Sequence, residues 1–451
     1  MKPVSKTLFS GVHIICPYTG LDGIGDVLVD AGRIGIVRRG GGLDAPDAEP
    51  IDGAGMVLAP GFVDLHTHLR EPGEEQKETI ETGAAAALAG GFTTLCAMPN
   101  TYPALDSRIS VETVCERAEG LGVRVLPIGA VTVGRMGERL APHHALAAAG
   151  VVAFSDDGSP VSNAGLMRHA LQYSEPTGLP ITSHCEELSI SAGGAMHEGA
   201  VSARLGVPGI PASAEEVMVR RDIALAEETG GRLHIAHIST TGAVLALREA
   251  RARGVPVTAE ATPHHLLLTD EWVAGWGTLD GGVPASHIVG DGAFDTSTKV
   301  NPPLRSREHV RAVLDGVRDG TIDVIATDHA PHASTDKACE YGCAAFGISG
   351  LETALGLLML LVHRGELNLF RLVHLLTSGP ASTFSLSTQG IREGAPADLV
   401  LFDPKQEWVV DGEALTSRGK NTPLHGHTLR GKVLMTVVGT RTYRAIQREE
   451  R

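Results

Sequence analysis

The chain has 451 residues, among them 38 lysines and arginines and 53 aspartates and glutamates, and its formal charge is −15 with neutral histidine. This acidic balance argues against a protein whose main role is to bind a phosphate backbone. A content of 43% hydrophobic and 20% charged residues is typical of a globular protein and excludes a disordered tail. The 6 scattered cysteines argue against a disulfide framework, whereas the 20 histidines favour a search for a metal site.

The beginning of the chain predicts neither a secretory leader nor a membrane anchor. Residues 1–20 contain Lys2 and Lys6, but His13 and Pro17 interrupt the apolar stretch that follows, and no A-x-A cleavage pattern is found. The longest apolar runs are far shorter than the ~18 residues that a membrane span requires. We therefore expect a cytoplasmic protein without a membrane or nucleic-acid partner.

The two ends of the chain are predicted to be rich in β-strands. Residues 1–58 contain many glycines, valines and turn signals, with a strand expected at 26–29 and an exposed loop at 39–50. Residues 393–451 have the same character, with a strand expected at 397–402. Since neither end is long enough for a good core of its own, we expect one composite β-sandwich domain built from both.

Between these ends, residues 59–392 alternate short β-branched runs with helical stretches rich in alanine and leucine. This alternation predicts parallel strands joined by helices. Helices are expected at 74–89 and at 214–229, the second beginning with a capping box formed by Ser213 and Glu216. Eight β/α units over this length predict an α/β protein with a (β/α)8 TIM barrel. The expected strands lie at 61–69, 92–99, 123–131, 151–155, 180–184, 233–238, 257–262 and 322–327.

The reactive groups of such a barrel come from the carboxyl ends of its strands. The first expected strand ends in the sequence DLHTHLR, residues 64–70. Because alternate residues of a strand point to the same side, His66, His68 and Arg70 share a face, and the two histidines could reach one metal ion. Two surface histidines on a loop would produce the same pattern.

Further residues able to bind a metal follow the other expected strands. For any one of them alone a structural role would be the better explanation, especially for His237 in its apolar run. Their joint position at the same end of five strands instead predicts a two-metal hydrolytic centre with a carboxylate between the metals. Asp328 is the candidate for moving a proton from water to a leaving nitrogen, with a helix cap as the alternative. The set comprises His66, His68, Asp156, Asp157, His184, His237, Asp328 and His329.

Residues that could contact a substrate lie beside these positions. Arg70 could make a bidentate contact with a carboxylate, because it shares the face of the two histidines. Asn100, Asn301 and His332 are further candidates, although each could be a turn residue. The histidine pair at 264–265 could consist of ligands or of bystanders, since the two metals already have enough donors.

Short motifs along nearly the whole chain carry a family signature. They are DLHTHLREPG at 64–73, MPNT at 98–101, MHEG at 196–199, TPHH at 262–265, NPPLR at 301–305, ATDHAPH at 326–332, FG at 346–347, residues 394–403 and NTP at 421–423. In order and content they resemble the dihydroorotases of the amidohydrolase superfamily, and most of all the class I bacterial enzymes. A glycine-rich stretch at 276–295 is longer than the family usually carries, but it removes no ligand.

The resemblance implies a binuclear zinc site, although other divalent metals could serve. In the most similar members of the family an aspartate bridges the metals, where related cyclic amidases use a carboxylated lysine. Asp157 is the expected bridge and Asp156 the alternative. The other implied ligands are His66, His68 and Asp328 for one zinc ion and His184 and His237 for the other.

The activity that the resemblance implies is a reversible ring closure in pyrimidine synthesis. N-carbamoyl-L-aspartate loses water to give L-dihydroorotate, and in the reverse direction a hydroxide held between the metals attacks the ring amide. Asp328 would serve as general base and acid. The implied substrate contacts are Arg70, Asn100 and His332 for the carboxylate, and Asn301 with the backbone of Phe346 and Gly347 for the ring amides.

Two other functions remain open from the sequence. Another cyclic amidase, such as an allantoinase or dihydropyrimidinase, is disfavoured by the aspartates on the fourth strand and by Arg70. A catalytically silent partner of aspartate transcarbamoylase would have lost metal ligands, whereas this chain keeps them. The sequence also leaves room for a homodimer and for a complex of the active enzyme with aspartate transcarbamoylase.

Overall fold

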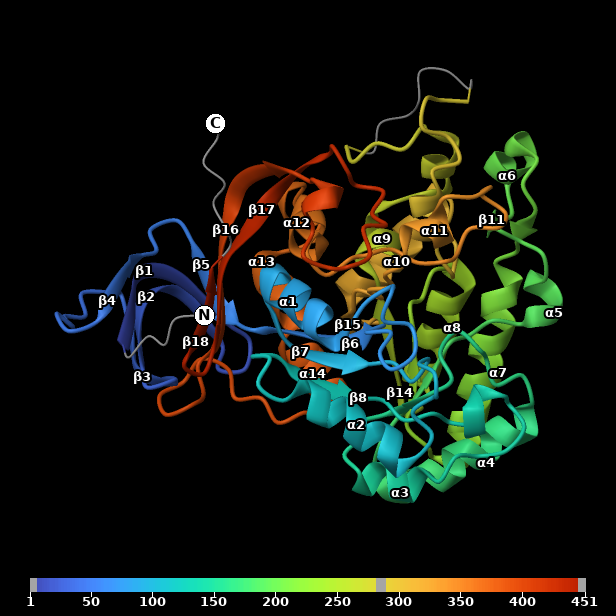
Figure 1. The fold of residues 1–451 in the computed structure, drawn as a ribbon, viewed down its shortest axis with the longest axis horizontal. Helices are drawn as coiled ribbons and strands as arrows, with labels where there is room; N and C mark the ends of the chain where they lie inside the picture. The colour runs from blue at the N-terminus through green and yellow to red at the C-terminus, as the bar shows by residue number, and fades with distance from the viewer. Residues whose placement is uncertain (1–5, 281–288, 445–451) are drawn as a thin grey trace.

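The computed structural model describes residues 6–280 and 289–444 (Figure 1). Its two parts lie side by side, a β-rich lobe and a barrel of parallel strands covered by helices. Part of the glycine-rich stretch at 276–295, namely residues 281–288, lies outside the described residues. In the described part of the chain, no helix is long and apolar enough to cross a membrane.

The β-rich lobe contains strands from both ends of the chain in one sheet, in the order β18-β17-β16-β5-β1-β2-β3, with β4 paired to β1. The two ends meet where β5 and β16 pair antiparallel, with Leu58 opposite Leu401. These two leucines and Phe9 belong to one buried apolar cluster. The predicted strand at 26–29 lies in β2, and the one at 397–402 lies in β16 except for its first residue. The strands of the lobe are β1 (Lys6–Cys16), β2 (Leu21–Asp30), β3 (Arg33–Arg39), β4 (Glu49–Asp52), β5 (Val57–Pro60), β16 (Asp398–Val409), β17 (Thr428–Val438) and β18 (Arg441–Arg444).

The barrel strands follow one another around a ring. One sheet has the order β6-β7-β8 and the other β15-β14-β13-β10-β9. Isolated bridges between Gly129 and Phe154, and between Thr67 and His329, join the two sheets on both sides. Each predicted strand is present in shortened form, and the α/β barrel fold is confirmed. The strands are β6 (Phe62–Thr67), β7 (Phe92–Ala97), β8 (Arg124–Pro127), β9 (Phe154–Ser155), β10 (Ile181–Ser183), β13 (Leu233–Ile235), β14 (Val257–Ala261) and β15 (Val324–Ile325).

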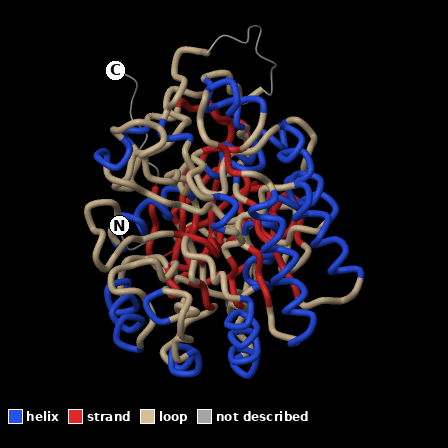
Figure 2. Tube along the Cα trace, turned by 90° about the vertical axis from the view of Figure 1, so that its right-hand side faces the viewer, coloured by secondary structure: helices blue, strands red, loops and turns tan. Residues whose placement is uncertain are grey.

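Helices form the outer layer of the barrel, around the strands (Figure 2). A short parallel pair of strands, β11 (Met196–His197) and β12 (Gly209–Ile210), lies beyond the ring. The helices are α1 (Ile80–Gly90), α2 (Arg108–Ala118), α3 (His143–Ala148), α4 (Ala164–Ser174), α5 (Leu188–Ser191), α6 (Ala200–Leu205), α7 (Ser213–Thr229), α8 (Thr241–Ala252), α9 (Pro263–Leu267), α10 (Arg307–Asp319), α11 (Ser334–Lys337), α12 (Ala354–His363), α13 (Leu369–Leu376) and α14 (Ser378–Thr383). The 3-10 turns are η1 (Val133–Arg135), η2 (Glu175–Thr177), η3 (Asp270–Ala274), η4 (Thr296–Thr298) and η5 (Gly412–Ala414).

Two helix predictions were wrong in their starting points. The helix expected from residue 74 begins at Ile80, where Thr79 caps it and accepts a hydrogen bond from the backbone of Thr82. The capping box at Ser213 is absent, because Ser213 is already the first helical residue and Ala212 is the N-cap. The carboxylate of Glu216 instead accepts from the backbone N–H of Gly242, at 3.0 Å. A tertiary contact thus replaces the local one.

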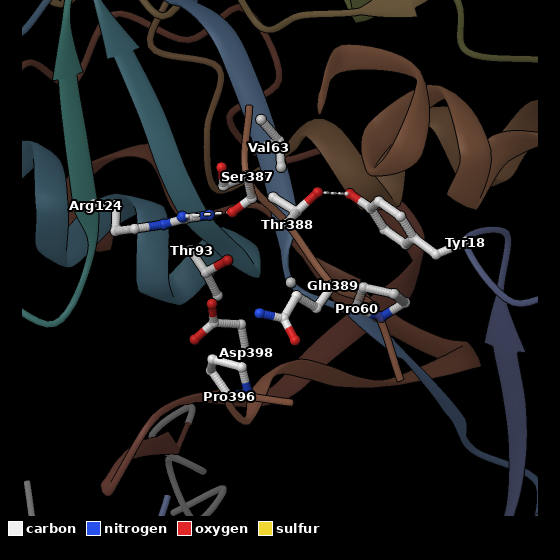
Figure 3. A pocket seen from close by; sticks show the side chains of 12 residues that line it. Tyr18, Pro60, Val63, Thr93, Arg124, Ser387, Thr388, Gln389, Pro396 and Asp398 are labelled. Atoms are coloured by element: carbon white, nitrogen blue, oxygen red, sulfur yellow. Dashed lines mark hydrogen bonds between the residues drawn. The ribbon is translucent and has the colours of Figure 1, made fainter. Parts of the chain in front are cut away.

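A small cavity of about 70 Å³ lies between the barrel and the lobe, where β6, β7 and β8 begin (Figure 3). Arg124 spans it, and its guanidinium donates to the hydroxyl of Thr94 and to the carbonyl of Ser387. Nearby, the hydroxyl of Thr388 donates to that of Tyr18 at 2.8 Å. The contact between Thr388 and Tyr18 joins the barrel to the lobe at the amino ends of the strands, and chemistry is expected at the opposite, carboxyl ends.

Candidate metal centre and active site

Four imidazoles surround the carboxylate of Asp157 at the carboxyl ends of the barrel strands. All five side chains are buried. From Oδ1 of Asp157 the distances are 3.5 Å to Nε2 of His66, 3.5 Å to Nδ1 of His184 and 3.6 Å to Nε2 of His237, and Oδ2 lies 3.6 Å from Nε2 of His68. The nitrogens therefore converge on one carboxylate from β6, β10 and β13.

This cluster fits a pair of divalent metal ions. In the described part of the chain, Oδ1 of Asp157 and Nε2 of His66 are buried without a hydrogen-bond partner, which is rare and costly unless another group binds them. The ligand atoms of His66, His68 and Asp157 lie within 4.8 Å of one another, and so do those of Asp157, His184 and His237. Neutral imidazole and carboxylate are the donors that zinc prefers beside thiolate. Because the two sets share Asp157, the geometry suits a bridging role for this residue.

Asp328 lies beside the first of these sets. Its Oδ1 is 3.1 Å from Nε2 of His68 and 3.4 Å from Nε2 of His66. Burial raises the pKa of this carboxyl, but the two histidines outweigh burial and leave the pKa below its usual range. The backbone of Asp328 has φ of 49°, and Arg70 and His237 also have positive φ, at 61° and 33°. Such strained residues cluster at functional sites, where the surrounding structure holds them.

Carboxylate and amide groups behind the histidines fix which nitrogen faces the centre. Nδ1 of His66 lies 2.6 Å from Oε1 of Glu260, and Nδ1 of His68 lies 2.9 Å from Oδ1 of Asn100. Both rings therefore present Nε2 to Asp157. Glu260 also binds Nε2 of His234 at 3.1 Å. Its role was missed from the sequence, although an acid within the apolar strand β14 was a usable signal.

His184 is turned the other way. Its Nε2 lies 3.0 Å from Oε2 of Glu186, so Nδ1 faces Asp157. The same carboxylate oxygen accepts from the amide nitrogen of Asn301 at 2.9 Å. Glu186 was also missed, because two residues after a histidine is an ordinary position for an exposed glutamate. It connects a candidate metal ligand to a candidate substrate contact.

The neighbouring aspartate, Asp156, points away from the centre. Its Oδ1 accepts from the backbone of Val131 and Thr132 at 2.9 and 3.1 Å, and its other oxygen accepts from the Thr132 hydroxyl. These contacts tie β9 to the segment after β8. They leave Asp157, rather than Asp156, in the position expected for a bridge.

Arg70 and His332 form the candidate substrate side of the site. The guanidinium of Arg70 is buried, and its Nε donates to the carbonyl of Pro331 at 3.2 Å. Its Nη2 lies 3.4 Å from Nε2 of His332, which donates to the carbonyl of Phe346 at 2.8 Å. Burial and Arg70 lower the pKa of His332 to about 2, so that the ring is neutral. No carboxylate pairs with Arg70 within residues 6–280 and 289–444, and most of its donors remain for an anion.

The other predicted substrate contacts already have partners within the protein. Asn100 and Asn301 bind His68 and Glu186, as described above. The N–H of Gly347 donates to the carbonyl of Lys299, and the carbonyl of Phe346 is taken by His332. Substrate contacts by these groups therefore stay predictions.

The histidine pair at 264–265 has a partly structural explanation. His265 lies 2.9 Å from the carbonyl of Pro302, to which its Nε2 donates, and its Nδ1 contacts the hydroxyl of Thr262. His265 is therefore a bystander that holds the backbone at Pro302, directly after Asn301. His264 is buried, and its Nε2 has no hydrogen-bond partner among the described residues.

Comparisons with known proteins agree with this site. Residues 55–243 match the family model described as Dihydro-orotase-like. The dihydroorotase of Anaeromyxobacter sp. (strain K) is 49% identical over 441 residues, which cover 97% of this chain and 98% of that protein. The dihydroorotase of Syntrophus aciditrophicus (strain SB) is 49% identical over 434 residues, with coverage of 96% and 98%.

Solved structures of cyclic amidases share the fold. An L-hydantoinase (dihydropyrimidinase) from Arthrobacter aurescens superposes with a TM-score of 0.82 at 24% identity, covering 97% of this chain and 95% of that one. A dihydropyrimidinase from Brevibacillus agri NCHU1002 gives a TM-score of 0.79 at 21% identity, with coverage of 97% and 94%. At these identities the likeness establishes the barrel and its β-sandwich domain.

Proposed function

Because the chain belongs to the dihydroorotase family, we propose that it interconverts N-carbamoyl-L-aspartate and L-dihydroorotate in pyrimidine synthesis. The observation that carries the proposal is the buried guanidinium of Arg70, which has no carboxylate partner in the described residues and lies beside the cluster around Asp157. A buried cation of this kind requires an anion, and both proposed substrates carry a carboxylate.

We further propose that two zinc ions occupy the cluster, although another divalent metal would fit the same donors. When bound, such a pair lowers the pKa of a shared water and polarises a carbonyl. Asp157 is proposed as the bridge, which is supported by its distances to all four imidazoles. The remaining proposed ligands are His66, His68 and Asp328 for one ion and His184 and His237 for the other.

Asp328 is proposed to move the proton. In the hydrolytic direction its carboxylate takes a proton from the attacking water and delivers it to the ring nitrogen as the C–N bond breaks. In the synthetic direction the carboxylate takes a proton from the ureido nitrogen as the ring closes and gives it to the departing hydroxide, which leaves as water. A positioned acid–base group of this kind contributes about 10²- to 10⁴-fold to a rate.

The substrate carboxylate is proposed to bind Arg70, with Asn100 and His332 beside it. Asn301 and the backbone of Phe346 and Gly347 are proposed to hold the ring amides. Because Asn301 also binds Glu186, which in turn orients His184, a substrate on Asn301 would be aligned with the metal centre. This alignment reduces the entropic cost of bringing the ring carbonyl to the nucleophile.

An assay with three rings tests the function. The purified, metal-replete protein is expected to turn over L-dihydroorotate and to leave allantoin and dihydrouracil untouched, because neither of those rings carries a carboxylate for Arg70. Preferential turnover of a neutral ring would overturn the proposal in favour of another cyclic amidase. Absence of turnover with all three would instead favour a silent partner of aspartate transcarbamoylase.

We place this activity in the cytoplasm, on a small-molecule substrate. A homodimer and a complex with aspartate transcarbamoylase are both compatible with it. Light scattering of the protein alone, and then mixed with the transcarbamoylase, would test both assemblies.

A further inference from the structure

A segment from the C-terminal end of the chain lies against the catalytic end of the barrel. This segment, residues 416–421, belongs to the connection between η5 and β17, two elements of the red part of Figure 1. The hydroxyl of Ser417 donates to Oε2 of the buried Glu78 at 2.5 Å, and the N–H of Arg418 donates to Oε1 at 3.1 Å. The same Glu78 lies 3.3 Å from Nε2 of His329, the residue after Asp328. The segment is thus linked through Glu78 to the loop that carries the proposed acid–base group.

The approach of this segment to His332 is close enough to require glycine. A Cβ atom on Gly419 would lie 2.7 Å from the backbone nitrogen of His332 and 2.5 Å from Cβ of Pro331. Contacts under 3 Å are essentially absent for real Cβ atoms, so any larger residue would displace the His332 loop or the segment. The backbone of residues 331–332 therefore takes its position in part from Gly419.

Asn421 bonds the same region with both ends of its side-chain amide. Its side-chain oxygen accepts from the N–H of His332 at 2.8 Å and lies 3.0 Å from the hydroxyl oxygen of Ser349, whose one proton is shared with the carbonyl of Gly419 at 2.8 Å. Its side-chain nitrogen donates to the carbonyls of Ala330 and Gly347, at 3.0 and 2.9 Å. Both N–H donors of the amide and its oxygen are therefore engaged. A buried amide with three full hydrogen bonds to residues 330–332 and 347 fixes the relative position of the two loops it joins.

Those two loops carry the proposed substrate contacts. One runs from Asp328 to His332, and the other contains Phe346 and Gly347. They also meet directly, because His332 donates to the carbonyl of Phe346. With Arg70 only 3.4 Å from His332, a shift of residues 330–332 would change the shape of the carboxylate pocket, whereas the four imidazoles and Asp157 follow other strands.

We propose that Asn421 is a positioning residue for the substrate carboxylate, acting through the backbone of His332 and Gly347. The inference rests on the proposed function and names a determinant of its specificity. Asn421 touches neither the metal ligands nor the reacting atoms, and its role is to hold the loops that recognise the anion.

The test compares an acid with its neutral analogue. For Asn421→Ala, kcat and KM are measured with L-dihydroorotate and with its carboxamide, which keeps the ring and lacks the charge. The kcat/KM for the acid divided by that for the carboxamide, called the ratio below, should fall by about tenfold or more. The fall should come mainly from a higher KM for the acid, because a misplaced pocket loses hydrogen bonds to the anion. Metal content should stay at the level of the unaltered protein.

Two further variants separate positioning from loss of stability. Gly419→Ala pushes on the His332 loop without touching Asn421, and it should lower the ratio in the same direction. Asn368→Ala removes the N-cap of α13, where the asparagine accepts from the backbone of Arg371, and should lower stability while leaving the ratio unchanged.

The outcomes are distinct. Equal losses of kcat/KM for acid and carboxamide in both Asn421→Ala and Gly419→Ala would overturn the positioning role. If the unaltered protein did not turn over L-dihydroorotate, the proposed function itself would fail, and this inference with it. A lowered ratio in both variants and an unchanged one in Asn368→Ala would support it.

Discussion

The carboxylate of Glu260 should control how tightly the cluster binds metal, although it is not a proposed ligand. It is fully buried, and it accepts from Nδ1 of His66 at 2.6 Å and from Nε2 of His234 at 3.1 Å. The backbone N–H of His237 lies 3.4 Å from the same carboxylate. Glu260 therefore holds one proposed ligand of each metal. Its negative charge also makes His66 a stronger donor.

The substitution Glu260→Gln keeps the shape and one acceptor oxygen but removes the charge. Outer partners of this type are worth about 10- to 100-fold in metal affinity. We expect about a 10-fold loss of metal affinity for Glu260→Gln, because His66 retains a weaker acceptor. For Glu260→Ala we expect about a 100-fold loss, because His66 loses its acceptor. The corresponding free energies are about 1.4 and 2.7 kcal/mol, at 1.36 kcal/mol per factor of ten.

Zinc affinity is measured by competition with a chromogenic chelator, and turnover is then measured with excess zinc. Excess metal should recover much of the activity of Glu260→Gln, because the ligands themselves are intact. The control is Asp26→Asn, which alters a buried carboxylate of the β lobe that accepts from the backbone of Gly11 and Leu43. Zinc affinity in Glu260→Ala that equals that of the Asp26 variant would refute the reasoning.

Three further predictions follow from the same geometry. Asp328→Ala should abolish turnover while most of the metal stays bound, and activity near that of the unaltered protein would contradict a shuttle at this position. Metal analysis should show loss of metal in Asp157→Ala and retention in Asp156→Ala, which should instead lower the melting temperature; the reverse pattern would assign the bridge to Asp156. Burial of the His143 ring, whose centroid lies 4.2 Å from that of Phe154, lowers the pKa of His143 to about 4, although its hydrogen bond to the carbonyl of Val131 acts in the opposite direction. Because the folded pKa lies below the ordinary 6.5, neutral His143 contributes its full share to the free energy of unfolding above pH 6.5. That contribution is lost as the pH falls toward 4, by about 3 kcal/mol at 1.36 kcal/mol per unit. In His143→Phe the unfolding free energy, measured in urea, should depend less on pH over this range, and an unchanged slope would contradict the assignment.

The barrel and most of its proposed ligands were predictable because each depends on local sequence. A β-branched run followed by a polar residue marks a strand and its carboxyl end, and parallel strands in a barrel bring those ends together. His66, His184 and His237 could be placed together on that basis before any contact was known.

The supporting residues could not be found in the same way, because their partners are distant in the chain. Glu260 lies 194 positions from His66, and Asn421 lies 89 positions from His332. The positive φ of Arg70 was likewise hidden, since arginine seldom adopts that conformation, and the enrichment of aspartate there does not single out Asp328 among the aspartates of the chain. The false capping box at Ser213 shows the converse case, in which a local rule yields to a tertiary contact.

The charge of the chain bears on how an anionic substrate is selected. A protein of formal charge −15 does not attract an anion by its overall field, so recognition has to be local. Burial makes the guanidinium of Arg70 costly when unpaired, and a bound carboxylate offsets that cost, so the interaction favours an acid over a neutral ring. This selectivity requires that the guanidinium and the His332 loop keep their relative position, since a bidentate contact depends on geometry. Residues 416–421 hold that position through Asn421. The C-terminal part of the chain therefore has a role in substrate choice as well as in folding.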